Sequence, residues 1–201
     1  HGWYLTIKHN KGLKKELDKF MLRSDTFSLG VCNGCQLMVK NKVFSDELKL
    51  KKNSSNKFES RYLTVTVKNG DNIFFKDMED MKFGIWVAHG EGRFVGTTSL
   101  DSSQKVLVYS NPQDSDTYSD DSLVEYPYNP NGSEGGLAGV VSLDGRHLAM
   151  MPHLERSFRS SQLPYLGEYN DIEESPWLYT FRNIYSWSFK NKNTFSLNKS
   201  I

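Results

Sequence analysis

The segment that most constrains this chain is residues 30–34, with the sequence Gly-Val-Cys-Asn-Gly. An apolar stretch at 26–31, typical of a buried strand, leads into it, and residues 36–39 after it suit the start of a helix. Gly-x-Cys-x-Gly at such a junction has the form of a nucleophile elbow, in which a Cβ at either glycine would collide with neighbouring backbone. The pattern predicts that a tight turn exposes Cys32 above the edge of a sheet.

This turn would also give Cys32 the surroundings that a nucleophile needs. Its thiol would lie near the N-terminus of the following helix, where the positive end of the helix dipole favours the thiolate. The backbone N–H of Asn33 would point towards the oxyanion that forms on an attacked carbonyl group. A buried and unreactive cysteine is the alternative interpretation of Cys32, because free cysteines are often buried.

The chain has two cysteines, Cys32 and Cys35, in C-x-x-C spacing, which excludes a framework of several disulfides. A redox motif at the start of a helix is one alternative. A zinc site would need about two more ligands nearby, and the histidines at 89, 147 and 153 are distant in sequence and have no paired spacing. We therefore predict no metal site and expect Cys35 to pack inward.

A thiolate nucleophile also needs a base and a group that orients the base. Apolar stretches at 137–143 and 147–151 flank Asp144-Gly145, which is a strong hairpin signal. The returning strand would carry His153 at its C-terminal end, and residues i and i+2 of an extended chain project to the same side. Glu155 could therefore reach the imidazole of His153. A purely structural histidine is the alternative, but His-x-Glu at a strand end beside a cysteine elbow favours catalysis.

The remaining patterns predict an α/β domain over residues 1–187, followed by a polar C-terminal tail at 188–201. An amphipathic helix at 13–21 is expected to pack on a sheet, and an aromatic-rich helix is expected at 177–187. Further strands are expected at 62–67, 73–75, 83–88 and 106–109, and loops at 40–57 and 111–122. The last residues, 190–201, are expected to be a loose tail.

The charge balance gives no reason to propose a nucleic acid or an anionic membrane as partner. Twenty-five basic residues face 24 acidic ones, for a formal net charge of +1. No apolar run approaches the roughly 18 residues that a membrane span requires. We therefore predict neither a nucleic-acid nor a membrane partner.

Residues 29–37, Leu-Gly-Val-Cys-Asn-Gly-Cys-Gln-Leu, resemble the elbow of the glutaminase domain of eukaryotic-type phosphoribosylformylglycinamidine synthases, which are class I glutamine amidotransferases. The resemblance covers nearly the whole chain, to about residue 187. Further motifs follow in the order of the family, at 25–28, 59–61, 88–92, 126–127, 129–133, 144–149, 153–155 and 175–178.

The resemblance implies a three-layer α/β fold with a mostly parallel central sheet, and it implies a reaction. Cys32 would attack the side-chain amide of glutamine, and His153, held by Glu155, would protonate the leaving ammonia. Water would then release glutamate from the thioester. The backbone of Asn33 would serve the oxyanion hole.

The resemblance also implies a glutamine pocket, shaped by Gln36, His89 and Gly90. Gln36 could instead hydrogen-bond within its helix, and His89 could be a turn residue. The ammonia would pass to an upstream, ATP-dependent synthetase domain of the same polypeptide, which makes formylglycinamidine ribonucleotide in purine biosynthesis. The whole would be a cytoplasmic, glutamine-dependent carbon–nitrogen ligase, with ATP and Mg²⁺ in the upstream domain and no cofactor in this one.

The chain departs from the family pattern in two places. Leu154 stands where the family usually has Pro between the catalytic His and Glu, which removes neither the imidazole nor the carboxylate. The family also has strands before the position of Gly2, including a glycine-rich loop with the other oxyanion donor. We therefore expect an N-terminally truncated domain that is weakly active or inactive when isolated. A catalytically silent amidotransferase-like interaction module is the alternative function, although the predicted triad is retained.

Overall fold

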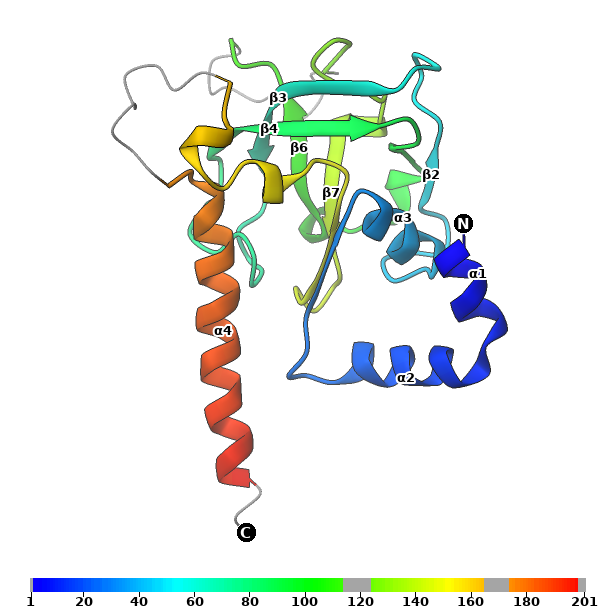
Figure 1. Cartoon of the computed structure of the whole chain (residues 1–201), viewed down its shortest axis with the longest axis vertical. Helices are drawn as coiled ribbons and strands as arrows, with labels where there is room; N and C mark the ends of the chain where they lie inside the picture. The colour runs from blue at the N-terminus through cyan, green and yellow to red at the C-terminus, as the bar shows by residue number, and fades with distance from the viewer. Residues whose placement is uncertain (1, 114–123, 165–173, 199–201) are drawn as a thin grey trace.

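The computed structural model describes residues 2–113, 124–164 and 174–198, and Figure 1 shows their arrangement. Its helices are α1 (Gly2–His9), α2 (Lys11–Leu22), α3 (Asn33–Lys40) and α4 (Trp177–Asn198). The strands are β1 (Ser28–Val31), β2 (Lys49–Lys51), β3 (Glu59–Val67), β4 (Lys82–His89), β5 (Arg93–Val95), β6 (Lys105–Ser110), β7 (Leu137–Val141) and β8 (His147–Met150). Among the described residues, the short 3-10 helices η1 to η5 lie at Thr97–Ser99, Ser102–Gln104, Glu134–Gly136, Leu154–Arg156 and Ser160–Gln162.

The central sheet has the strand order β1-β8-β7-β6-β3-β4. Its β1 and β8 strands are parallel, whereas the other four neighbouring pairs among the described residues are antiparallel. The α/β class is as predicted, but the sheet is mixed rather than mostly parallel. The connection between β7 and β8 shows the reason: it is a tight turn with Gly145 at a φ of 71°, and parallel strands would need a crossover of about a dozen residues.

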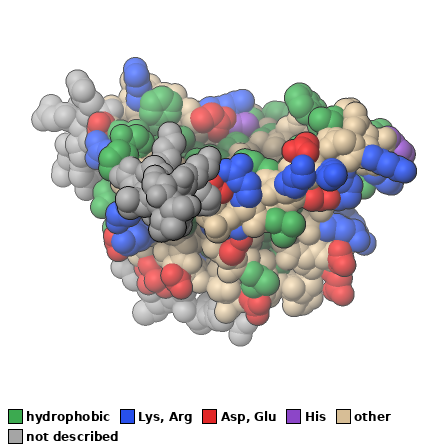
Figure 2. All heavy atoms as spheres, turned by 90° about the horizontal axis from the view of Figure 1, so that it is seen from below, with side chains coloured by type: hydrophobic (Ala, Val, Ile, Leu, Met, Phe, Trp, Pro, Cys, Tyr) green, Lys and Arg blue, Asp and Glu red, His purple; other side chains and the backbone are tan. Residues whose placement is uncertain are grey.

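Helices α1 and α2 lie at the periphery of the molecule, with α1 beside α3 (Figure 1). The α2 helix confirms the expected amphipathic helix, but it buries none of its residues, so the expected packing on a sheet is wrong. Seen from below, the surface shows separate hydrophobic side chains among charged ones (Figure 2). Among the described residues, no helix is long and apolar enough to cross a membrane.

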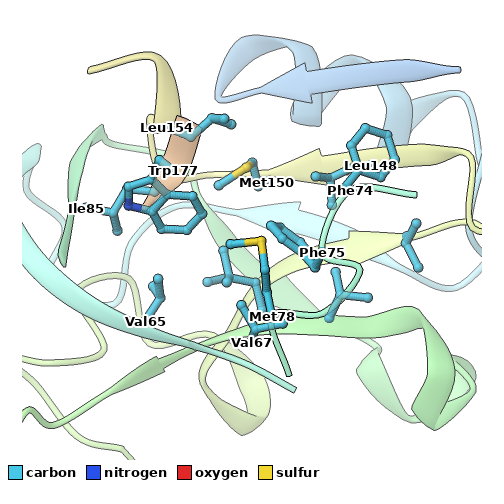
Figure 3. Packing of buried hydrophobic residues seen from close by; sticks show 14 of the residues in the cluster. Val65, Val67, Phe74, Phe75, Met78, Ile85, Leu148, Met150, Leu154 and Trp177 are labelled. Carbon is cyan, nitrogen blue, oxygen red and sulfur yellow. The ribbon is translucent and has the colours of Figure 1, made fainter. Parts of the chain in front are cut away.

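Two hydrophobic clusters occupy the two faces of the sheet. The first contains Trp177 and Ile184 of α4, and Figure 3 shows Trp177 near Met150 of β8. The second contains Cys35 and Val39 of α3. Successive residues of β8 alternate between the clusters, as the two-residue period of a strand requires. The sheet therefore lies between α3 and α4, which confirms the three layers.

The expected strand at 73–75 is wrong, because this segment is a turn. Its Phe74 and Phe75 are nonetheless fully buried in the first cluster (Figure 3). The side-chain oxygen of Asn72 accepts hydrogen bonds from the backbone N–H groups of both, each at 3.0 Å. A single side chain thus satisfies the buried backbone donors that a sheet ladder would otherwise satisfy.

Three other expectations concern the loops and the C-terminal part. The expected loop at 40–57 contains β2, which pairs with the unpredicted strand β5. The α4 helix continues past the expected end at 187 to Asn198, so the expected loose tail is largely helical. Most of the expected loop at 111–122 lies outside the described residues. The domain boundary at 187 stays a prediction.

Candidate active site

The predicted elbow is present at the junction of β1 and α3. Cys32 stands between the last residue of β1 and the first residue of α3, with φ 50° and ψ −99°. A positive φ at a residue other than glycine stores backbone strain, and such strain is concentrated at functional sites. The helix α3 begins within the motif, and Asn33 is its first residue. The backbone N–H of Asn33 is therefore one of the groups that a helix leaves without an internal acceptor.

The two glycines of the elbow differ in their steric role. A Cβ added to Gly30 would lie 2.8 Å from the backbone carbonyl carbon of Gly34, so position 30 requires glycine. A Cβ added to Gly34 would meet no atom within 4 Å. The predicted requirement is thus confirmed at Gly30 and wrong at Gly34, because Gly34 already lies within α3 and its missing side chain would face open space.

The sheet brings His153 to the elbow. Because β1 and β8 are parallel neighbours, their C-terminal ends meet at one edge, and the backbone N–H of Cys32 donates to the carbonyl of Met150 at 2.9 Å. His153 follows shortly after β8, and its backbone N–H donates to the carbonyl of Trp86 at 2.8 Å. Its Nδ1 lies 2.6 Å from the carboxylate of Glu155, which is the expected contact. The expected extended chain is wrong, because Glu155 lies in the 3-10 helix η4.

The electrostatics of this pair favour a charged imidazole. Interaction with the Cys32 thiol, followed by the hydrogen bond to Glu155, raises the pKa of His153 to about 9. Burial raises the pKa of Glu155, but the hydrogen bond with His153 and further favourable interactions outweigh it, so the pKa ends below its usual value. At neutral pH, His153 is therefore an imidazolium beside a carboxylate.

The second ring nitrogen of His153 is the informative atom. His153 is only 7% exposed, and its buried Nε2 makes no hydrogen bond of ordinary geometry with any described residue, although the neighbouring Cys32 thiol raises the pKa of the ring. Buried polar atoms without a partner are uncommon and call for an explanation. Since Glu155 occupies Nδ1, Nε2 is the nitrogen that remains for the Cys32 thiol and for a substrate.

The segment at 88–92 forms another side of the site. The Cys32 Sγ lies 3.7 Å from the carbonyl oxygen of Ala88, and the side-chain amide of Gln36 donates to the carbonyl of Glu91 at 2.8 Å. Gln36 does not bond within its own helix through this group. The structure thus brings Gln36 and the segment that contains His89 and Gly90 to the elbow, while their part in binding glutamine stays a prediction.

His89 itself faces the interior. It is 2% exposed, its Nδ1 lies 3.3 Å from Oδ1 of Asn53, and its Nε2 lies 3.5 Å from the hydroxyl of Tyr109. Burial, and next the charge on His153, lower the pKa of His89 to about 4. A neutral imidazole therefore supports the 88–92 segment from inside, and any role of His89 in a substrate pocket is indirect.

Comparison with known proteins now decides the family. Residues 1–188 match the family of CobB/CobQ-like glutamine amidotransferase domains. The chain belongs to this family.

Relatives of this amidotransferase domain are long proteins. It is 40% identical over 211 residues to the phosphoribosylformylglycinamidine synthase of Drosophila melanogaster. The matching region covers 94% of this chain and 15% of that protein. The chain is 35% identical over 212 residues to the synthase of Homo sapiens, with 94% and 16% covered. The chain therefore spans about one sixth of the length of these relatives.

A solved structure shares the fold of this amidotransferase domain. The structure of PurLQS from Thermotoga maritima matches it with a TM-score of 0.60 and 25% sequence identity. The match covers 87% of this chain and 66% of that chain. The family resemblance and the amidotransferase-like α/β fold that were predicted from the sequence are thereby confirmed.

Three residues of the amidotransferase domain that support the 88–92 segment were not predicted individually as site residues. Asn53 lies in a stretch whose Lys, Asn and Ser content indicated a solvated loop, yet it is 1% exposed. Tyr109 was assigned only to a strand. Asn131 belongs to the 129–133 motif, and its side-chain amide donates to the carbonyl of Gly92 at 2.7 Å. Composition could not reveal these residues, because their partners are distant in sequence.

The redox alternative finds little support in this amidotransferase domain. Cys35 is fully buried, and burial raises the pKa of its thiol well above the usual value, which disfavours the thiolate that exchange chemistry needs. Within 2–113, 124–164 and 174–198, no three His, Cys, Asp or Glu side chains come together as metal ligands would.

Proposed function

We propose that this chain hydrolyses the side-chain amide of glutamine through Cys32, His153 and Glu155. The observation that supports the proposal most is the unpartnered, buried Nε2 of His153, whose ring is held by Glu155 at the edge where the strained elbow presents Cys32. A nucleophile, a base and an orienting carboxylate are the three parts that covalent amide hydrolysis requires.

In the proposed reaction, the Cys32 thiolate attacks the amide carbon, and the carbonyl π electrons move to the oxygen. The tetrahedral oxyanion then collapses, the carbon–nitrogen bond breaks, and the imidazolium of His153 gives its Nε2 proton to the leaving ammonia. Neutral His153 next removes a proton from water, whose attack on the thioester releases glutamate and restores the thiolate. Glu155 keeps the proton on Nδ1, so that Nε2 exchanges protons in both steps.

The start of α3 would stabilise the oxyanion. Asn33 follows the nucleophile directly, and its backbone N–H lies in the first turn of the helix. A donor in this position is typical of nucleophile elbows, and losing one oxyanion donor costs on the order of 10²–10³ in rate. Gln36 and the backbone of the 88–92 segment would hold the glutamine beside Cys32.

The wider function is part of the same proposal. Because the relatives are named phosphoribosylformylglycinamidine synthase, we propose that the ammonia serves the synthesis of formylglycinamidine ribonucleotide in purine biosynthesis. The acceptor would be a synthetase domain upstream in the same polypeptide, which would use ATP and Mg²⁺, while this domain uses no cofactor. A cytoplasmic location stays a prediction, and a relative from Arabidopsis thaliana is named as chloroplastic/mitochondrial.

Trapping the thioester tests the glutaminase. The full-length protein is incubated with labelled glutamine and quenched in acid, and the peptide that contains Cys32 is analysed by mass spectrometry. We expect a hydroxylamine-sensitive glutamyl adduct on Cys32 in the wild type and in Cys35→Ser, and none in Cys32→Ser. A redox protein would lose its activity in Cys35→Ser, and a silent interaction module would form no adduct in any of the three.

A second assay tests the transfer of ammonia. With ATP and formylglycinamide ribonucleotide, Cys32→Ser should lose product formation from glutamine but keep product formation from added ammonium salt. Loss of both would contradict a role that is confined to ammonia supply.

A further inference from the structure

We infer that Asn53 is a positioning residue, which sets the 88–92 segment at the distance from Cys32 that glutamine needs. The inference rests on the proposed glutaminase function and adds a residue from a segment that contributes no group to the triad. Asn53 lies between β2 and β3, where the chain has no regular structure.

The side chain of Asn53 is fully engaged. Its amide nitrogen donates to the carbonyl of His89 at 2.7 Å and to that of Lys57 at 2.9 Å. Its oxygen accepts from the backbone N–H of Gly92 at 3.3 Å and lies 3.3 Å from Nδ1 of His89. Its backbone N–H donates to the carbonyl of Gly90 at 2.9 Å. One buried residue thus binds three members of the 88–92 segment.

These contacts also assign the proton of His89. A neutral imidazole has one N–H, and the oxygen of Asn53 can only accept, so Nδ1 of His89 donates to Asn53. Its Nε2 is then the acceptor for the hydroxyl of Tyr109. The pKa of His89, lowered to about 4 mainly by burial, agrees with this neutral form.

The segment that Asn53 binds is the one that borders the nucleophile. Its first residue, Ala88, presents its carbonyl oxygen 3.7 Å from the Cys32 Sγ, and Gln36 of α3 binds the carbonyl of Glu91. The segment is also tightly folded on itself, because a Cβ added to Gly92 would lie 2.8 Å from Nδ1 of His89. Asn53 therefore binds the residues next to Ala88 and Glu91, the two members of the segment that contact Cys32 and Gln36.

A displacement of this segment should act on substrate binding rather than on the nucleophile. The elbow and His153 are held by β1, β8 and the carbonyl of Trp86, and none of these accepts a hydrogen bond from Asn53. Misplacement of a substrate-binding group by about 1 Å can cost on the order of 10²-fold.

The test uses Asn53→Asp in the full-length protein. The substitution keeps the shape of the side chain but places an oxygen against the carbonyl oxygens of His89 and Lys57, so the segment is repelled. We expect the KM for glutamine to rise by up to about 10²-fold while kcat changes much less. The rate at which iodoacetamide alkylates Cys32 should stay the same, because this small reagent needs no substrate pocket. Asn53→Ser, which keeps one hydroxyl donor, should raise the KM by a smaller factor.

Asn72→Asp is the matched control, because the side chain of Asn72 also makes three hydrogen bonds within its own loop. Asn72 lies next to Gly145 of the turn between β7 and β8, whereas His153 follows the opposite end of β8. This variant should lower the melting temperature without changing the KM. An unchanged KM in Asn53→Asp would overturn the inference, as would a parallel loss of iodoacetamide reactivity. A wild-type protein that releases no ammonia from glutamine would instead overturn the proposed function.

Discussion

The helices α2 and α3 are both amphipathic, but they have different structural roles. The α3 helix buries Cys35 and Val39 in the second hydrophobic cluster, directly behind the elbow. The α2 helix buries no residue, and its Leu22 is 84% exposed. Hydrophobic periodicity therefore indicates that a segment is helical but does not show how deeply the helix packs.

Hydrogen bonds from two side chains of the β7–β8 hairpin to backbone carbonyls, rather than burial of its own side chains, hold the C-terminal end of α2. Arg146 donates to the carbonyls of Arg23, Thr26 and Met21, and Nε2 of His147 lies 3.3 Å from the carbonyl of Met21. Elements with little buried apolar surface open most easily, whereas catalytic groups need a rigid support. We therefore expect changes near α3 to have large effects and changes on α2 to have small ones.

The largest effect should come from Glu155→Gln, which changes the partner of His153 in the proposed active site but leaves Cys32, at the start of α3, in place. The change removes the carboxylate that fixes Nδ1 of His153 and lowers the pKa of His153 from its value of about 9. We expect kcat/KM to fall about 10²–10⁴-fold, as when the orienting carboxylate of a triad is replaced. The alkaline limb of the pH–rate profile should also move to lower pH, because the imidazolium that protonates ammonia is lost earlier.

The same variant carries a stability prediction with a defined sign. The folded-state pKa of His153, about 9, lies above its ordinary value of 6.5, so its stabilisation is complete below pH 6.5 and is lost as the pH rises through about 9. The melting temperatures of wild type and Glu155→Gln should therefore differ most below pH 6.5 and converge above pH 9. A difference that grows with pH would contradict the charged pair.

Gly30→Ala and Gly34→Ala compare two positions within the elbow itself. At Gly30 the new Cβ would lie 2.8 Å from backbone, so we expect a loss of about 3 kcal/mol in the free energy of unfolding. At Gly34 the Cβ is free of contacts and lies in a helix, where alanine is favoured over glycine by at most about 1 kcal/mol. Urea unfolding of the chain measures both. Equal destabilisation would show that the elbow is looser than the structure indicates.

His89 provides a third comparison, because it is buried beside the proposed active site and not on a peripheral helix such as α2. Its folded-state pKa of about 4 is below the ordinary 6.5, so the stability that it contributes is complete above pH 6.5 and is lost as the pH falls towards 4. This shift corresponds to at most about 3 kcal/mol. His89→Gln should be less stable at neutral pH but should lose less stability between pH 6.5 and 4. Parallel pH profiles of the two proteins would disprove the buried neutral imidazole.

The sequence predicted those parts of the site that depend on short spacing. The elbow needs a glycine two residues before the nucleophile, and Glu155 reaches His153 because the two are separated by one residue. The turn around Asp144-Gly145 was predictable for the same reason, although only Gly145 of the two has a positive φ.

Features that depend on distant partners were not predictable. Asn53 binds a segment more than thirty residues away, and nothing in its neighbourhood distinguishes it from a solvated asparagine. Phe74 and Phe75 have the apolar composition of a strand, but they form a buried turn whose backbone N–H groups donate to the side chain of Asn72. The mixed sheet also escaped prediction, because apolar runs mark strands without giving their direction.

The smallest effect should come from α2 itself, and it tests the comparison most directly. Leu22→Lys changes a side chain that is 84% exposed, so we expect a change of less than about 0.5 kcal/mol in the free energy of unfolding. Val39→Ala on α3 removes two methyl groups at a position that is 4% exposed, which should cost about 2 kcal/mol. If the two substitutions cost the same in urea unfolding of the chain, α2 is packed as α3 is, and the distinction fails.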